Sequence, residues 1–147
     1  MGLINYFDTE KTTIAILKDW RDQEFRRDHS ASGIRSINDR MTALQGFNST
    51  TPVQGGGNKR EENLCGLIDK KTVLEHGKVL ADEYFAEIEQ CWQQLTEDER
   101  FLLEARFIDG KDYGGIGRIM DRFHVEKTKA YEMSNAALRR LAHLLFW

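Results

Sequence analysis

Five polar side chains near the end of the chain have the chemistry needed to read base pairs. Along one expected helix they occupy positions i, i+1, i+4, i+5 and i+8, and they are Lys127, Thr128, Tyr131, Glu132 and Asn135. In the major groove of DNA, lysine can donate to guanine, threonine can contact the thymine methyl group, and glutamate can accept from cytosine. Asparagine could read adenine or bind a phosphate. The same spacing also fits a solvated helix face, so a base-reading role is a hypothesis that depends on the surrounding elements.

Positive charge gathers in the same part of the chain. Residues 113–147 carry a net charge of +3, whereas residues 1–112 carry −6. A basic end on an acidic chain indicates a polyanionic partner for that end alone. Phosphate contacts position a protein on DNA without specifying sequence. The candidates for such contacts, each of which could instead be merely solvated, are Arg118, Arg122, Lys129, Arg139 and Arg140.

The sequence does not assemble the residues of an enzyme. The four histidines are scattered and show no metal-ligand spacing. The glycine-rich run from Gly114 to Gly117 follows an expected helix and not a strand, which excludes a nucleotide-binding loop. Cys65 and Cys91 either form one disulfide or, as we expect for a cytoplasmic protein, stay reduced. We therefore expect no catalytic activity, no cofactor and no bound metal.

The elements that must position the polar side chains are expected to be helices. The chain has 147 residues, of which 40% are hydrophobic, and it contains a single proline. These numbers fit one all-α domain, or one domain with a helical appendage. The sequence begins without the pattern of a signal peptide and contains no apolar run of membrane-spanning length. We expect a protein of the cytoplasm with no membrane partner.

Residues 1–46 are predicted to form a helical hairpin. Thr9 can cap its first helix. The small residues from Ser30 to Gly33 indicate a break, and Gly46 stands where a C-cap glycine would end the second helix.

A flexible linker is expected at residues 47–59, followed by one long helix at residues 60–95. A heptad repeat in this helix suits coiled-coil packing on the chain's own hairpin or in a homodimer. It consists of Leu67, Leu74, Ala81, Ile88 and Leu95. Gly77 weakens the middle of the helix, and a break near residues 75–78 would make two helices, so both possibilities stay open.

Residues 96–147 are predicted to form a helix-turn-helix domain. Thr96 and Glu99 have the spacing of a capping box, and the helix that they begin should end at Asp109-Gly110. A second helix is expected at about 113–122.

A turn at His124-Val125 is expected to precede the last helix, which starts at Glu126. Histidine tolerates a left-handed backbone better than branched residues do, whereas glutamate is a weak cap. The residues expected to face inward from the last helix are Ala130, Met133, Ala137, Leu138 and Leu141.

Four motifs follow one another in this domain at fixed distances. They are Thr96-Glu97-Asp98-Glu99-Arg100, Arg106-Phe107-Ile108-Asp109-Gly110, Phe123-His124-Val125 and Ala137-Leu138-Arg139-Arg140-Leu141. Together they resemble the fourth conserved region of bacterial sigma factors, which binds the −35 promoter element. The resemblance implies double-stranded DNA as the partner. It also places Lys127, Thr128, Tyr131 and Glu132 at base-reading positions of the sigma pattern.

A wider resemblance covers most of the chain. Gly56-Gly57-Asn58-Lys59, ahead of a Leu67-Ile68-Asp69-Lys70 helix, makes the sequence similar to the ArpU-like, phage-encoded late regulators of Gram-positive bacteria. This resemblance implies a sigma-like transcriptional regulator of phage or prophage origin that activates late genes. One alternative is a module that docks on host RNA polymerase without specific DNA binding. Another is a small terminase-like DNA binder for phage packaging, which predicts a ring-like oligomer.

Overall fold

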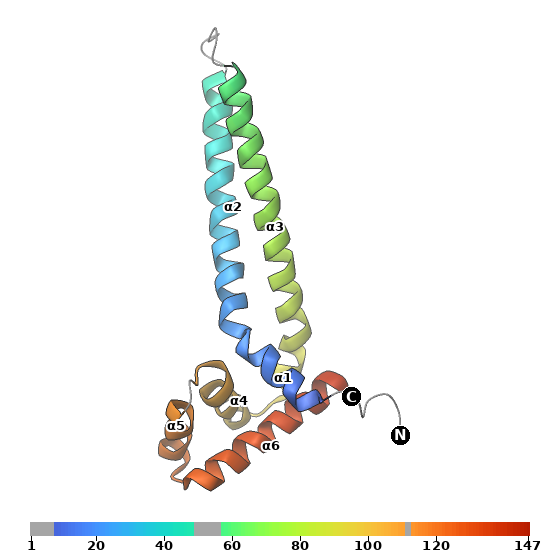
Figure 1. The fold of residues 1–147 in the computed structure, drawn as a ribbon, viewed down its shortest axis with the longest axis vertical. Helices are drawn as coiled ribbons and strands as arrows, with labels where there is room; N and C mark the ends of the chain where they lie inside the picture. Colours follow the sequence, from blue (N-terminus) through green and yellow to red (C-terminus); the bar gives the residue numbers. More distant parts are fainter. Residues whose placement is uncertain (1–7, 49–56, 111–112) are drawn as a thin grey trace. The chain divides into compact units, whose positions relative to one another are not determined.

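Every element in the described part of the chain is a helix, which confirms the expected all-α class. The computed structural model describes residues 8–48, 57–110 and 113–147. The elements in these ranges are the α-helices α1 (Thr9–Lys18), α2 (Trp20–Asn48), α3 (Gly57–Gln94), α4 (Glu97–Leu103), α5 (Tyr113–Phe123) and α6 (Lys127–Phe146), with a π-helix, η2 (Glu104–Ile108), directly after α4 (Figure 1). None of the helices in these ranges has the length and apolarity needed to cross a membrane.

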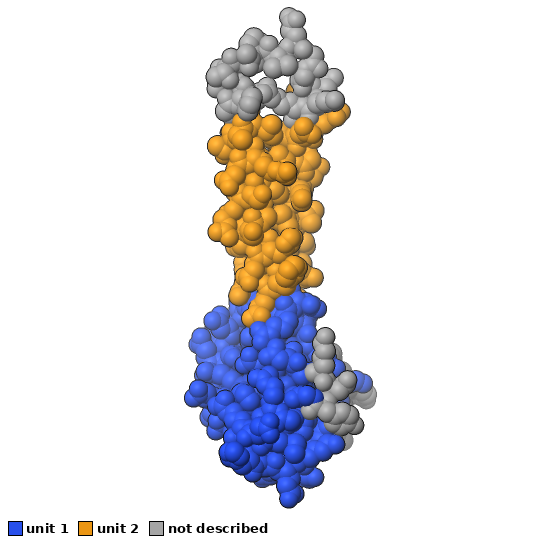
Figure 2. All heavy atoms as spheres, turned by 90° about the vertical axis from the view of Figure 1, so that its left-hand side faces the viewer, with its two compact units in different colours: residues 1–22, 85–147 blue, residues 23–84 orange. Residues whose placement is uncertain are grey.

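The helices belong to two compact units, coloured separately in Figure 2. Unit 1 comprises residues 1–22 and 85–147 and contains α1, α4, η2, α5 and α6 together with the last turns of α3. Unit 2 comprises residues 23–84 and contains most of α2 and α3. The DNA-binding domain predicted to start at residue 96 is therefore only part of a larger unit.

Helix α1 belongs to unit 1 because its apolar side is buried there. Thr13 and Leu17 are fully buried, and α1 packs against α6 and η2. The helix is capped by Asp8, whose carboxylate accepts a hydrogen bond from the backbone N–H of Lys11 at 3.0 Å. Thr9, the predicted cap, is instead the first helical residue. The predicted hairpin over residues 1–46 thus does not form, since α1 packs with helices from the other end of the sequence.

The predicted break from Ser30 to Gly33 is wrong, because α2 runs unbroken from Trp20 to Asn48. The interruption lies earlier, at Asp19 between α1 and α2, and Gly46 lies inside α2 instead of ending it. Ser30 and Gly33 are small because they face α3. A Cβ on Gly33 would lie 2.8 Å from Cδ1 of Leu74, so the leucine side chain packs directly over this glycine.

Helix α3 is one helix, Gly57–Gln94, so the possible break at residues 75–78 does not form. Gly77, which weakens the helix locally, faces the buried Ser30 of α2, whose Oγ would lie 3.5 Å from a Cβ on this glycine. Of the predicted linker 47–59, residues 47–48 and 57–59 are helical and residues 49–56 lie outside the described ranges. The hairpin of unit 2 is therefore made by α2 and α3.

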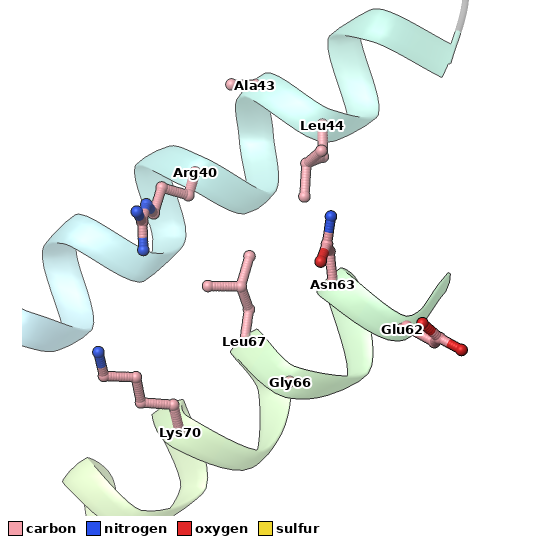
Figure 3. Close-up of a pocket in the computed structure, with 8 residues that line it drawn as sticks. All are labelled: Arg40, Ala43, Leu44, Glu62, Asn63, Gly66, Leu67 and Lys70. Atoms are coloured by element: carbon pink, nitrogen blue, oxygen red, sulfur yellow. The ribbon is translucent and has the colours of Figure 1, made fainter. Parts of the chain in front are cut away.

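The heptad side chains of α3, together with Leu95 just after its end, are at least half-buried within a single chain. Ala81, Ile88 and Leu95 are buried, and Leu67 and Leu74 are half-buried. Ala81, Ile88 and Leu95 are therefore already used in packing within the chain, whereas Leu67 and Leu74 keep part of their surface exposed. In unit 2, α2 and α3 also enclose a groove of about 680 Å³, in which the side chains of Leu44 and Leu67 point toward each other (Figure 3).

The C-terminal end of α3 is held inside unit 1. The Trp20 ring packs on Phe85 and Trp92 of α3, with ring centroids 5.4 and 4.9 Å away. Arg100 donates to the carbonyl oxygens of Trp92 and Gln93 at 2.9 and 2.8 Å. The last carbonyl groups of a helix have no partner within the helix, so these bonds satisfy groups that would otherwise need water.

Both cysteines are free thiols. Cys65 is exposed, whereas the Cys91 thiol lies 3.4 Å from the carbonyl oxygen of Leu144 and donates to it. The alternative of a disulfide is therefore not realised.

Candidate nucleic-acid interface

The first helix of the predicted helix-turn-helix domain begins and ends where the sequence indicates. Thr96 Oγ1 accepts from the backbone N–H of Glu99 at 3.2 Å, and the Glu99 carboxylate accepts from the N–H of Thr96 at 3.0 Å, which confirms the capping box. The π-helix η2 follows α4 directly and ends at Ile108. The next residue, Asp109, donates its N–H to the carbonyl oxygen of Glu104 at 2.8 Å.

Helix α5 lies against η2 through a glycine. Ile116 and Ile119 are buried, and Gly115 is buried beside them. A Cβ on Gly115 would overlap the backbone carbonyl oxygen of Ala105, so only glycine fits this helix contact. The sequence pattern around Gly115 excluded a nucleotide loop but did not reveal this packing role, because it depends on the backbone of another element.

The turn between α5 and α6 is tight and left-handed at one residue. His124 has a φ of 52°, which confirms the left-handed backbone predicted for this turn residue. No other non-glycine residue in the described ranges has a positive φ. Val125 donates its N–H to the carbonyl oxygen of Met120 at 3.3 Å. Glu126 is the N-cap of α6 and its side chain makes no capping hydrogen bond, which confirms the weak cap.

The left-handed residue gives a prediction for stability. His124→Gly should make unit 1 more stable than His124→Ala does, by about 1 kcal/mol, because a Cβ is unfavourable in this conformation. Both variants lose the imidazole ring, so their difference isolates the backbone effect. Urea unfolding followed by tryptophan fluorescence measures it. An alanine variant at least as stable as the glycine variant would mean that the turn is not strained.

Helix α6 has one buried side and one exposed side. The buried side chains are Ala130, Ser134, Ala137, Leu138, Leu141 and Ala142. Of the predicted inward residues, Met133 is only half-buried. Four of the five candidate base-contacting residues (Lys127, Thr128, Glu132 and Asn135) are exposed, whereas Tyr131 is half-buried. The first turn of α6 therefore presents Lys127 and Thr128 directly after the turn.

Arg106 of η2 organises two of the candidate residues, and sequence analysis gave it no role. Its Nη1 donates to Ser134 Oγ at 2.7 Å and to Asn135 Oδ1 at 2.6 Å. The guanidinium group lies 4.9 Å from the ring centroid of Tyr131, a cation–π distance. Burial lowers the pKa of Arg106 from its ordinary value. No local signal revealed this contact, because Ser134 can bond to the carbonyl oxygen of Ala130 in its own helix, at 2.9 Å, and does not require a partner from another element.

Two of the candidate phosphate contacts lie on α5 and stack on the same ring. The guanidinium groups of Arg118 and Arg122 are 5.4 and 4.2 Å from the centroid of Phe101. Each also pairs weakly with a carboxylate, Arg118 with Asp109 at 3.9 Å and Arg122 with Asp98 at 3.8 Å. Exposed pairs of this kind contribute about 0–1 kcal/mol, so a phosphate could replace the carboxylates at little cost.

The remaining candidates lie on α6 and differ from one another. Lys129 and Arg139 are exposed, and the Lys129 ammonium group is 4.0 Å from the Glu132 carboxylate. Arg140 donates to Glu99 at 2.5 Å and to the carbonyl oxygen of Gln94, the last residue of α3, at 3.1 Å. A phosphate contact by Arg140 would compete with these bonds.

Comparison with known proteins adds no relative. No protein-family model, curated protein or solved structure matches the chain. Among the described residues, no group of three or more His, Cys, Asp or Glu side chains is placed to hold a metal ion. The geometry of unit 1 offers a helix with one exposed polar side, preceded by a tight turn and flanked by exposed arginines.

Proposed function

We propose that the protein is a sequence-specific DNA-binding transcriptional regulator that reads DNA with the first turns of α6. The observation that carries the proposal is the exposure of Lys127 and Thr128 at the start of a helix whose other side is buried. A recognition helix uses its N-terminal residues to contact base edges while its other side packs on the domain. The resemblance to sigma factors and ArpU-like regulators extends the proposal to a sigma-like activator of late genes, of phage or prophage origin.

Two electrostatic features around α6 support the proposal of DNA binding. The N-terminus of a helix carries a partial positive charge, which attracts phosphate groups. Arg118 and Arg122 are exposed on α5, the helix that precedes the turn. These side chains would fix the register on DNA, and Lys127 and Thr128 would discriminate between bases.

The proposal is tested by selecting binding sites for the full chain from a library of random double-stranded DNA. Affinity for the selected site is then measured by fluorescence anisotropy at several salt concentrations. We expect log K to fall linearly with log salt, because phosphate contacts release counterions. Failure to enrich any sequence would contradict the proposal.

Lys127→Ala is expected to weaken binding to the selected site by about tenfold or more, because each good base contact is worth about 1–3 kcal/mol. It should also relax the base preference at one position. The matched control is Lys18→Ala, which removes an exposed lysine from α1 and should change neither quantity. If both variants weaken binding equally, the contribution of Lys127 is unspecific charge attraction to DNA and not a base contact.

The alternatives give different results in the same experiments. Binding to purified RNA polymerase without sequence-selective DNA binding would favour the docking module. A ring-like oligomer in analytical ultracentrifugation would favour the packaging protein, whereas a monomer or a homodimer fits the regulator.

A further inference from the structure

We propose that two copies of this chain associate antiparallel through an exposed face of α3 in unit 2. Four charged side chains of alternating sign mark this face, and we call them the charged row: Lys71, Glu75, Lys78 and Asp82. The interface uses side chains other than the heptad repeat, which packs within the chain. It is also independent of DNA binding, so it stands or falls separately from the proposed function.

The charges of the row remain available to a partner. The four residues are spaced by four, three and four positions, which places them along one side of a helix. Their side chains are between 30% and 54% exposed. Within the row, Lys71 Nζ lies 3.8 Å from Glu75 Oε1, and Lys78 Nζ lies 3.5 Å from Asp82 Oδ2. Exposed pairs of this kind contribute little to stability, so a second copy can recruit these charges at little cost.

The order of the charges suits an antiparallel partner. In a two-fold dimer, two copies of one helix run either antiparallel or parallel in the same register. An antiparallel copy with the axis between residues 76 and 77 places Lys71 level with Asp82 and Glu75 level with Lys78, and the symmetry repeats both pairs. A parallel copy would place each charge level with the same charge, which is unfavourable. An identical antiparallel chain therefore supplies an opposite charge for every member of the row.

Apolar groups beside the charged row are also exposed. Ile68 is 44% exposed and Val79 is 52% exposed, and both lie next to the row on α3. Here α2 and α3 enclose a second groove, of about 600 Å³, which is lined by Ala31, Ile34, Arg35, Glu75, Lys78 and Val79. The α3 residues of this groove span 75–79 and so lie level with the proposed axis, where the grooves of two copies meet. Burial of the apolar groups favours association, and the charged row sets its direction and register.

Sedimentation velocity of the full chain over a wide range of concentrations tests the proposal. The wild type should form dimers as the concentration rises. Lys78→Glu places glutamates level with each other across the interface and should raise the dissociation constant of the dimer by about tenfold or more. Lys18→Glu is the control, because it changes the net charge equally at an exposed residue of α1 and should leave the dissociation constant unchanged. A wild type that is monomeric at every concentration would overturn the proposal and leave this face to a different partner.

Adding Glu75→Lys to Lys78→Glu separates contacts between copies from effects within one helix. Within the helix, the single and the double variant both have one attractive and two repulsive pairs among neighbouring members of the row. Between antiparallel copies, only the double variant restores opposite charges at all four positions. The double variant should therefore recover most of the wild-type dimer affinity. If it dimerises no better than Lys78→Glu alone, the antiparallel alignment is wrong.

Cross-linking tests the direction of the two helices without changing the charged row. At a rise of 1.5 Å per residue, the two copies of Cys65 would lie about 35 Å apart along the helix axes, and the two copies of residue 79 about 8 Å apart. A short bismaleimide should link Val79→Cys, made in a Cys65→Ser chain, into dimers. It should not link the wild type through Cys65, which is exposed. Mass spectrometry of the linked peptides identifies the cysteines, and a link between two copies of Cys65 would overturn the proposal.

Discussion

Replacing Leu17 by alanine is expected to lower the free energy of unfolding of unit 1 by about 2–5 kcal/mol. Leu17 is fully buried on α1, which packs against α6 and η2. The shorter side chain loses these apolar contacts and leaves a cavity that the neighbouring helices fill only in part. Urea unfolding measured by tryptophan fluorescence reports this loss, because Trp20, Trp92 and Trp147 all lie in unit 1.

Two control variants separate this effect from general changes in the chain. Lys18→Ala alters the next residue of α1, which is exposed, and should leave the unfolding midpoint nearly unchanged. Val73→Ala shortens an aliphatic side chain of unit 2 that is 71% exposed, and it should also have little effect. If Leu17→Ala and Lys18→Ala unfold at the same urea concentration, α1 is not an integral part of unit 1.

Gly115→Ala is expected to lower the free energy of unfolding of unit 1 by about 3 kcal/mol. This value is the upper end of the range of about 1–3 kcal/mol for overpacked sites. The new Cβ would overlap the backbone oxygen of Ala105, and a backbone atom cannot move aside as the end of a flexible side chain can. Either α5 must shift away from η2 or the overlap must distort η2. Because α5 leads into the turn before α6, we also expect the variant to bind DNA more weakly than the wild type under conditions in which it is still folded.

The matched control lies two residues further along the same helix. A Cβ on Gly117 would meet no heavy atom within 4 Å, so Gly117→Ala adds a methyl group in open space. Alanine is preferred over glycine inside a helix by up to about 1 kcal/mol, so this variant should be slightly stabilised. A lower free energy of unfolding for Gly115→Ala together with a higher one for Gly117→Ala would support the close contact. A change in the same direction for both variants would contradict it.

Local signals in the second half of the sequence predicted the structure well. The Thr96 capping box and the left-handed His124 both depend on atoms a few residues apart in the chain. Such interactions can be recognised from residue types and spacing alone. For this reason the predicted helix boundaries between residues 96 and 147 agree with the structure to within about two residues.

Interactions between distant segments were not predicted. Ser30, Gly33 and Gly77 have low helix propensity and indicated breaks, yet each lies inside a long helix and packs on the opposite helix of unit 2. The contribution of a small residue to helix packing depends on the side chain that faces it, and the local pattern does not contain that side chain. The assignment of α1 to unit 1 escaped prediction for the same reason.

In the candidate site, too, local features were predicted and contacts between distant segments were not. Helical spacing and the resemblance to sigma factors led to Lys127 and Thr128, which are exposed at the start of α6. The same spacing treated Tyr131 and Asn135 as independent side chains, whereas both contact Arg106. Arg106 comes from η2, so its contact with α6 becomes visible only when the helices are packed.

The division of unit 1 between two stretches of sequence has a consequence for how the chain folds. Residues 1–22 and 85–147 must meet, although the whole of unit 2 separates them along the chain. Closing a flexible loop costs entropy that rises only with the logarithm of its length, by about 0.6 kcal/mol for each doubling. An early hairpin of α2 and α3 would replace most of that loop with ordered structure and bring the two stretches together. Because the cost changes so slowly with length, α2 and α3 could gain or lose matching turns in evolution while unit 1 stayed the same.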